Sequence, residues 1–270
     1  MPKTSRRPWL LAAGALLLTA AVVPVVVGNA IAQDTGGVEP RIVGGDKASL
    51  ADHPYAVYLT DSNNYQYCGA VIVSSTTVVT AAHCAAAVKQ DEVRVVAGRE
   101  DKRSSDGKVF KVSKMWTHPD FTRPEKGDDI AVLTVAGRLP YRPAKVATAS
   151  DSDAYREGTK ATVLGWGRVS DGGDRSDYLR SAVVPVTSDA TCKSGYDVYD
   201  AKSMVCAGYP KGGIDACTGD SGGPLVVGDT LIGIVSYGVG CGQPGKPGVY
   251  TRVATYADQI AEHEQPRLFG

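Results

Sequence analysis

The chain has 270 residues, of which 43% are hydrophobic and 21% are charged. This composition excludes a disordered or fibrous protein, and the length is sufficient for one large domain or two small ones. Lys and Arg total 29, as do Asp and Glu, so no strong field favours nucleic acid or an anionic membrane as a partner.

The first segment, residues 1–32, has the three parts of a secretory signal: basic residues, an apolar run over 9–27 and small residues at its end. An uncleaved membrane anchor is the alternative, because about 20 apolar residues can span a bilayer. Pro24 within the run disfavours that alternative. Ser5–Leu10 also resembles a twin-arginine signal, so the export route stays open. We expect cleavage after Ala32, secretion and no membrane attachment afterwards.

The next segment, residues 33–41, is polar, contains glycine and proline and has no apolar periodicity. It has the character of a short propeptide that is removed, and it ends at Arg41.

Short runs rich in Val, Ile, Leu and Tyr then recur between clusters of Gly, Asp and Ser, which predicts antiparallel strands and not alternating strands and helices. The first series is 55–59, 70–73, 77–81, 93–97, 109–112 and 130–135. The second series is 159–164, 179–186, 224–227, 231–237 and 248–253. We therefore expect two β-barrels, over residues 42–150 and 151–270.

The end of the chain carries a different pattern. Val253, Tyr256 and Ile260 fall at helical spacing, which predicts a C-terminal helix with an apolar stripe packed on the second barrel. His263 follows in a polar segment that we expect to be solvated.

Three motifs far apart in the chain carry residues suited to nucleophilic catalysis. Ser221 lies in the glycine-framed turn 219–223, where its hydroxyl and nearby backbone N–H groups can face one point. His83 follows an apolar run, and Asp129 precedes another.

The turn alone also satisfies the G-x-S-x-G pattern of α/β-hydrolases, whose three residues follow the order Ser, acid, His. Here the order is His83, Asp129, Ser221, and only His263 follows the serine. Pro224 also stands where that fold would need a helix. The motif order therefore favours a different class of hydrolase.

Taken together, the motifs resemble the chymotrypsin/trypsin family of serine proteases, and in particular the trypsins of actinomycetes, over about residues 42–260. The resemblance implies an all-β fold of two antiparallel six-stranded β-barrels with a C-terminal α-helix. It also implies a secreted endopeptidase in which Ser221 attacks, His83 acts as base and then acid, and Asp129 orients the imidazole. A catalytically silent homologue that acts as a binding module is the alternative.

Asp128 is a rival for the acid. Because side chains alternate along the strand predicted from Ile130, Asp128 and Asp129 should point to opposite faces, and the family motif favours Asp129. His53 and His118 each precede a proline, so we expect both to be turn residues.

The resemblance also assigns the groups around the serine. The N–H groups of Gly219 and Ser221 are expected to bind the oxyanion. Asp215 matches an acidic pocket floor, and a buried carboxylate selects a cationic side chain, so cleavage after Arg or Lys is expected. The residues expected to form this pocket are Asp215, Ala216, Ser236, Gly238 and Gly248.

Two positions depart from the family pattern. Ala216 stands where some trypsins carry serine, so a hydroxyl that could solvate a lysine ammonium is missing. Arginine can still pair with Asp215 through two hydrogen bonds, so we expect Arg to be preferred over Lys. Tyr237 replaces the usual tryptophan, which leaves the preference at the neighbouring substrate position open.

The run Ile42–Gly45 matches the mature N-terminus of the family. The resemblance implies a zymogen in which cutting after Arg41 frees an ammonium on Ile42, which pairs with Asp220. Because Arg41 is itself basic, we expect the enzyme to activate its own precursor.

Six cysteines, with no C-x-x-C pair and an export signal, predict disulfides, for which 15 pairings exist. The resemblance selects Cys68 with Cys84, Cys192 with Cys206, and Cys217 with Cys241. No cofactor or metal is expected, because the segment 100–108 at the position of the family's calcium loop has few oxygen ligands. The expected partners are protein or peptide substrates with Arg or Lys and a proteinaceous inhibitor, and we expect a monomer.

Overall fold

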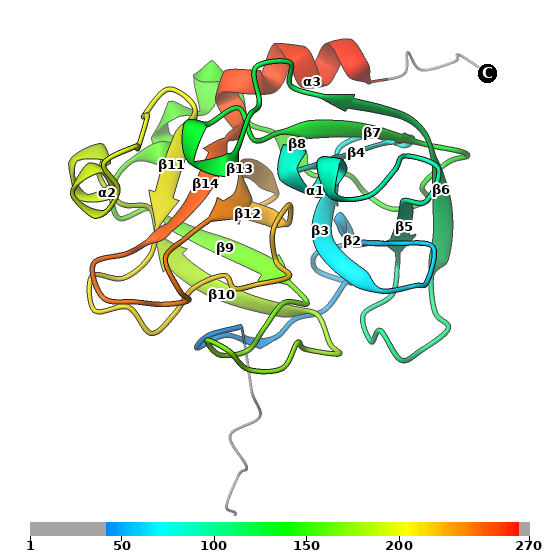
Figure 1. Ribbon diagram of the computed structural model, residues 1–270, viewed down its shortest axis with the longest axis horizontal. Helices are drawn as coiled ribbons and strands as arrows, with labels where there is room; N and C mark the ends of the chain where they lie inside the picture. The colour runs from blue at the N-terminus through cyan, green and yellow to red at the C-terminus, as the bar shows by residue number, and fades with distance from the viewer. Residues whose placement is uncertain (1–41, 265–270) are drawn as a thin grey trace, which may run out of the picture. The chain divides into compact units, whose positions relative to one another are not determined.

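The computed structural model describes residues 42–264. The predicted signal, the propeptide and Arg41 therefore lie outside the described residues. Figure 1 shows two groups of strands side by side, with α3 lying across the top of the view. The two groups touch through β2 against β9 and β3 against β12.

The first group is a closed barrel of antiparallel strands in the order β2-β3-β4-β7-β6-β5. Its strands are β2 (Ala56–Thr60), β3 (Gln66–Ile72), β4 (Thr77–Thr80), β5 (Arg94–Ala97), β6 (Lys108–Thr117) and β7 (Ala131–Val135). Strands β2, β4 and β7 are buried along their whole length, which explains why each reads as a continuous apolar or threonine-rich run. All six lie where the first series of runs predicted strands.

The second group is a sheet in the order β1-β10-β9-β12-β13-β14-β11. Its strands are β1 (Asp46–Lys47), β9 (Lys160–Gly165), β10 (Arg180–Pro185), β11 (Met204–Ala207), β12 (Pro224–Val227), β13 (Thr230–Tyr237) and β14 (Gly248–Arg252). An isolated bridge between Val186 and Ala207 links the far ends of β10 and β11. Thr187 N donates to Cys206 O at 2.9 Å beside this bridge. A second ring of six antiparallel strands, β9 to β14, is thus closed, and the predicted all-β fold is confirmed.

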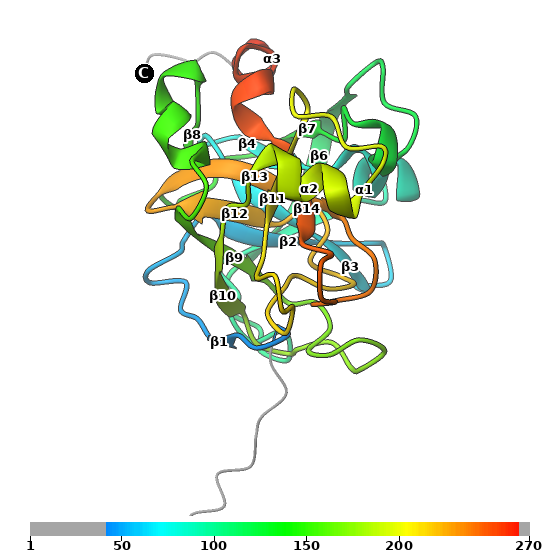
Figure 2. The ribbon, with the colours of Figure 1, turned by 90° about the vertical axis from the view of Figure 1, so that its left-hand side faces the viewer.

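Two further strands cross between the halves. β1 pairs with β10, as Figure 2 also shows, and β8 (Lys145–Val146) pairs in parallel with β13. Both precede residue 150, so the chain segment of the first half also contributes to the second sheet. The division at residue 150 stays a prediction.

The described helices are short. They are α1 (Ala82–Ala87), α2 (Asp189–Gly195) and α3 (Ala257–His263), with 3₁₀ turns η1 (Pro124–Lys126), η2 (Ala149–Tyr155) and η3 (Val253–Tyr256). The predicted C-terminal helix is present as η3 followed by α3, and its stripe of Val253, Tyr256 and Ile260 is buried. None of the helices in residues 42–264 is long and apolar enough to cross a membrane.

His263 is less solvated than expected, although Ala261 and Glu262 before it are exposed. Its ring centroid lies 4.4 Å from that of Trp116, and the residue is half-buried. Helix α3 carries His263 back onto β6, because the buried stripe of the helix holds the C-terminal segment against the molecule.

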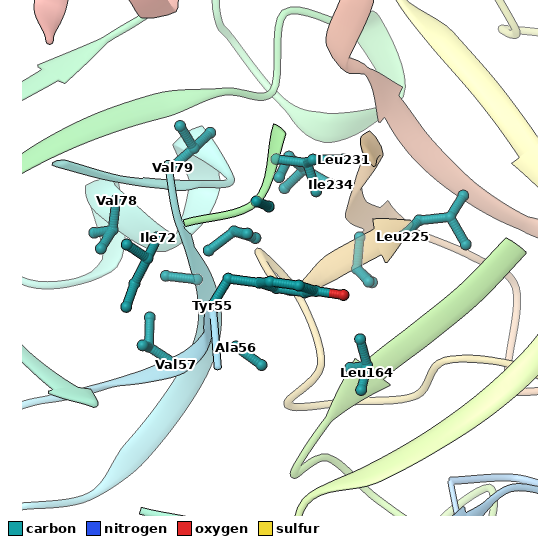
Figure 3. Packing of buried hydrophobic residues seen from close by; sticks show 14 of the residues in the cluster. Tyr55, Ala56, Val57, Ile72, Val78, Val79, Leu164, Leu225, Leu231 and Ile234 are labelled. Atoms are coloured by element: carbon teal, nitrogen blue, oxygen red, sulfur yellow. The ribbon is translucent and has the colours of Figure 1, made fainter. Parts of the chain in front are cut away.

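Side chains from both halves meet in one core. Figure 3 shows the ring of Tyr55 extending from the first barrel toward Leu164 of β9 and Leu225 of β12, and Tyr55 is fully buried. Tyr58 and Trp166 make an edge-to-face contact with centroids 5.0 Å apart. The two barrels are therefore packed against each other beside the loop that follows Trp166 and the loop that precedes β12.

Candidate active site

The loop carrying Ser221 is fixed by close backbone packing against β3 and β4. Gly222 has φ +81°, and a Cβ there would come within 2.2 Å of Thr80 Oγ1. Gly69 N donates to Ser221 O at 2.8 Å, and a Cβ on Gly69 would lie 2.8 Å from Gly223 Cα. Glycine is required at these points because any side chain would separate the loop from the first barrel.

The structure brings His83 and Asp129 together. His83 is in α1, where its backbone N–H donates to Asp129 Oδ1 at 2.9 Å, and its Nδ1 lies 2.8 Å from Asp129 Oδ2. Asp129 is only 1% exposed. A carboxylate partner at Nδ1 fixes the proton on that nitrogen, which leaves Nε2 free to accept a proton.

Asp129 is also bonded to the second barrel. Ser236 Oγ donates to Asp129 Oδ2 at 2.6 Å, and Thr251 Oγ1 donates to Asp129 O at 2.7 Å. The Asp129 carboxylate thus accepts three hydrogen bonds: from the backbone N–H of His83, from His83 Nδ1 and from Ser236 Oγ. The sequence assigned Ser236 to the substrate pocket alone and gave no role to Thr251, because neither contact can be read from local spacing.

Asp128 points elsewhere. It has φ +54°, and its Oδ1 accepts the Tyr256 hydroxyl at 2.8 Å and lies 3.9 Å from His118 Nδ1. Alternation along a strand is not the cause, because β7 begins only at Ala131. The left-handed backbone of Asp128 separates its side chain from that of Asp129.

The other histidines are structural in their contacts. His53 Nδ1 is 3.0 Å from the hydroxyl of Tyr55. His118 is buried and packs edge-on against Trp116 and Tyr256. A turn follows directly at residues 119–120, near the expected position. The His118 side chain also contributes to the packing around Trp116 and Tyr256.

The disulfide between Cys68 and Cys84 lies between His83 and the serine loop. Cys84 Sγ is 3.5 Å from His83 Nε2 and also 3.5 Å from Ser221 O. Within residues 42–264, no hydrogen bond joins Nε2 to the Ser221 hydroxyl. Such bonds are often long before substrate binds and shorten in the complex.

All three pairings implied by the resemblance are formed, and the other two are Cys192 with Cys206 and Cys217 with Cys241. Cys68, His83 and Cys84 place their donor atoms close enough for a metal ion. Both sulfurs are already in the disulfide, so this group holds no metal as it stands.

Two backbone donors near the serine are free. Gly219 has φ +101°, and in the described part of the chain neither its N–H nor that of Ser221 donates to a protein acceptor. The loop is held from behind, because Gln66 Nε2 donates to Gly219 O at 2.9 Å. Two unpaired donors beside one hydroxyl can stabilise charge that develops on a carbonyl oxygen attacked by that hydroxyl.

A cavity of about 140 Å³ opens beside Ser221. The predicted pocket residues Asp215, Ala216, Ser236, Gly238 and Gly248 all line it. Asp215 is 4% exposed; its Oδ2 accepts Gly242 N at 3.1 Å, while its Oδ1 has no partner. Burial raises the pKa of Asp215 to about 7, and the hydrogen bond from Gly242 opposes the rise.

Glycine at 248 keeps this floor accessible. A Cβ on Gly248 would lie 2.6 Å from Asp215 Oδ1 and 3.2 Å from the Tyr250 hydroxyl. That hydroxyl is buried without a partner, and Tyr250 is one of the residues that line the cavity. Sequence reasoning missed Tyr250, although its position two residues after Gly248 puts it on the same face of β14.

Asp220 is fully buried between the serine and the second barrel. Its two oxygens accept Gly167 N at 2.7 Å and Cys217 N at 2.9 Å. Burial raises its pKa to about 6, although these bonds and the charges of Lys102 and Arg175 oppose the rise. Ile42 is fully buried as well, and its proposed pairing with Asp220 stays a prediction.

The segment after Ile42 is joined to the pocket floor, because Asp215 N donates to Val43 O at 3.2 Å.

A family model described as Trypsin matches residues 42–260. The fold and this match show that the chain belongs to the trypsin family, and it is a serine endopeptidase that acts on protein or peptide substrates.

Individual relatives agree. The chain is 47% identical over 221 residues to a trypsin of Saccharopolyspora erythraea, an alignment that covers 82% of this chain and 97% of the relative. It is 37% identical over 234 residues to trypsin-1 of Astacus astacus, covering 81% and 98%. It is 36% identical over 249 residues to trypsin 5G1 of Aedes aegypti, covering 86% and 93%. The similarity to a bacterial trypsin accords with the resemblance seen in the sequence.

Proposed function

We propose that the protein is a secreted endopeptidase that cleaves after Arg, and more slowly after Lys, and that it is made as a zymogen activated after Arg41. The observation that carries the specificity is the unpaired Asp215 Oδ1 at the end of a cavity that opens beside Ser221. A buried carboxylate without a partner favours a cationic side chain, since an apolar one would leave the charge uncompensated.

The chemistry follows from the same residues. Ser221 Oγ bonds to the substrate carbonyl carbon while its proton passes to His83 Nε2, and the carbonyl oxygen turns toward the N–H groups of Gly219 and Ser221. His83 then gives the proton to the departing amine, which leaves an acyl ester on Ser221. Water repeats the sequence and releases the acid. Asp129 stabilises the imidazolium through its 2.8 Å contact with Nδ1.

Arginine is preferred because Ala216 offers no hydroxyl to a lysine ammonium. A guanidinium can donate to both Asp215 oxygens. A lysine side chain is shorter, so its ammonium depends more on a hydroxyl beside the carboxylate. Equal kcat/KM values on matched Arg and Lys esters would contradict this preference.

Hydrolysis of an Arg ester, with 1:1 inactivation by an organophosphate at Ser221, tests the activity itself. His83→Ala should abolish turnover, while His263→Ala should retain it, because His263 contacts Trp116 and not the serine loop. A folded protein that binds peptides but shows neither turnover nor inactivation would instead support a silent homologue.

Activation is tested with the precursor. If the enzyme cuts its own chain after Arg41, a purified Ser221→Ala precursor keeps residues 33–41, whereas the unaltered precursor loses them. N-terminal sequencing of the secreted protein reads both processing sites. Loss of 33–41 from the pure alanine variant would rule out self-activation.

A further inference from the structure

Two cations converge on one buried residue, Gln66, beside the oxyanion donors: one on its side-chain amide and one on its backbone carbonyl. Lys102 Nζ lies 3.4 Å from Gln66 Oε1, and the Arg175 guanidinium donates to Gln66 O. Gln66 in turn holds Gly219 O through its Nε2. Arg175 is close to the loop itself, because a Cβ on Gly219 would lie 3.0 Å from Arg175 Nε.

These two charges are not neutralised by an ion pair. Among residues 42–264, neither Lys102 nor Arg175 forms an ion pair with a carboxylate. The pKa of Lys102 is lowered chiefly by burial, with Asp177 opposing the shift and Arg175 adding to it. Asp177 is engaged with Arg103 at 3.6 Å, and Asp220 is fully buried with both oxygens occupied by N–H donors.

The pair lies on the side of the serine from which the amine product, the first to leave, departs. The cavity for the side chain before the scissile bond is lined by other residues, and Gln66 is not among them. The leaving amine takes its proton from His83, next to the disulfide of Cys68. Gln66 is two residues before Cys68 on β3 and bonds to Cys68 O at 3.5 Å, so β3 runs along the path of the leaving segment.

We infer that Lys102 and Arg175 form a cationic subsite that selects an acidic side chain at one of the first two positions after the scissile bond. The inference rests on the proposed function. Arg175 also packs over the Tyr65 ring, 5.0 Å from its centroid, which fixes the guanidinium beside an exposed aromatic surface. A carboxylate placed there meets two half-buried cations that, among residues 42–264, are bonded to Gln66 and form no ion pair with a carboxylate.

Internally quenched peptides with one Arg at the cleavage point test the subsite, with Asp, Asn or Lys placed in turn at the first and second following positions. The expected order of kcat/KM at one of these positions is Asp, then Asn, then Lys. Arg175→Gln and Lys102→Gln should each lower the Asp-to-Asn ratio roughly threefold to tenfold, as loss of a half-buried charged contact predicts. Added salt should also lower the ratio.

Each rate is divided by that on an Arg p-nitroanilide, which has no residues after the scissile bond. This division cancels any effect of a variant on the oxyanion donors Gly219 and Ser221 that is common to all substrates. Arg156→Gln is the matched control, because Arg156 is 75% exposed and pairs with Asp153 away from this surface; its ratio should equal that of the unaltered enzyme. An Asp-to-Asn ratio near one at both positions, or a ratio unchanged in both variants, overturns the inference. Absence of anilide hydrolysis would instead contradict the proposed function.

Discussion

At the scale of single residues, Asp215 links specificity to pH. Because burial raises its pKa to about 7, the carboxylate is partly protonated in neutral solution, and a cation must bind the ionised form. The affinity for benzamidine should therefore fall about tenfold for each pH unit below 7. Inhibition constants measured from pH 5 to 9 check this, and Asp215→Asn should bind weakly with a flat profile.

The same residue affects stability with a definite sign. The pKa of Asp215 in the folded chain lies above its ordinary value of 3.8, so the folded state holds more protons between pH 4 and 7. The free energy of unfolding attributable to this group therefore falls as pH rises through that window and is constant above it. The pKa of Asp220 is also raised, so this group lowers the free energy of unfolding with rising pH in the unaltered protein and in an Asp215→Asn variant alike. Thermal melts should therefore show a smaller loss of stability with rising pH for Asp215→Asn than for the unaltered protein. An equal decline would contradict the assignment.

Ala216 lines the same cavity, and its replacement tests the basis of the proposed Arg preference. Ala216→Ser adds a hydroxyl that can accept a hydrogen bond from a lysine ammonium, worth about 0.5–1.5 kcal/mol. The Lys-to-Arg ratio of kcat/KM should rise roughly threefold to tenfold, and matched esters measure it. A fall in both rates with no change in the ratio would show that the hydroxyl does not reach the bound cation.

Residue types and motif order predicted His83, Asp129 and Ser221, and the family resemblance added the cavity residues. The structure pairs His83 with Asp129 and places Ser221 beside the cavity. What spacing could not predict are contacts between distant strands. Ser236 on Asp129 joins two barrels, and Gln66 on Gly219 joins residues far apart in the chain. Neither Ser236 nor Gln66 stands in a sequence motif that indicates these contacts. The catalytic roles of His83, Asp129 and Ser221 stay predictions.

At the scale of elements, most strands of both sheets were predicted, because buried β-strands give continuous apolar runs. The four-residue β11 was missed, although β4, β5 and β12 are equally short and were predicted, so strand length alone does not explain the difference. Helix α1 was also missed: it has only six residues and no side-chain cap, so tertiary contacts and not propensity define it.

The disulfides offer a comparison between elements. Cys68–Cys84 and Cys192–Cys206 span 16 and 14 residues, so removing either should destabilise the fold by a similar amount, roughly 2–5 kcal/mol. Only the first contacts His83 and the serine loop. Replacing its two cysteines by alanine should therefore also lower kcat, whereas the Cys192/Cys206 double variant should keep kcat per folded molecule. Thermal melts and active-site titration separate the two effects, and equal kcat losses would contradict this account.

At the scale of the whole molecule, the site depends on how the two barrels are held together. His83 and Asp129 come from the first half and Ser221 from the second, while Ser236 and Thr251 of the second half bond to Asp129. The geometry of the proposed catalytic residues is thus set by the barrel interface and not by either barrel alone. Side chains that fill this interface should affect turnover as well as stability.

Tyr55 is the test of that dependence, because its buried ring extends from the first barrel toward β9 and β12, and β12 begins three residues after Ser221. Tyr55→Ala should cost about 3–5 kcal/mol of stability. It should also lower kcat per titrated site on the order of tenfold to a hundredfold, because small displacements of reacting groups are costly. Phe110→Ala, in β6 of the first barrel with β5 and β7 as partners, is the control: it should lower the melting temperature and leave kcat per titrated site near that of the unaltered enzyme. Similar kcat losses in both variants would mean that general loosening of the fold, and not the interface, controls the geometry of the site.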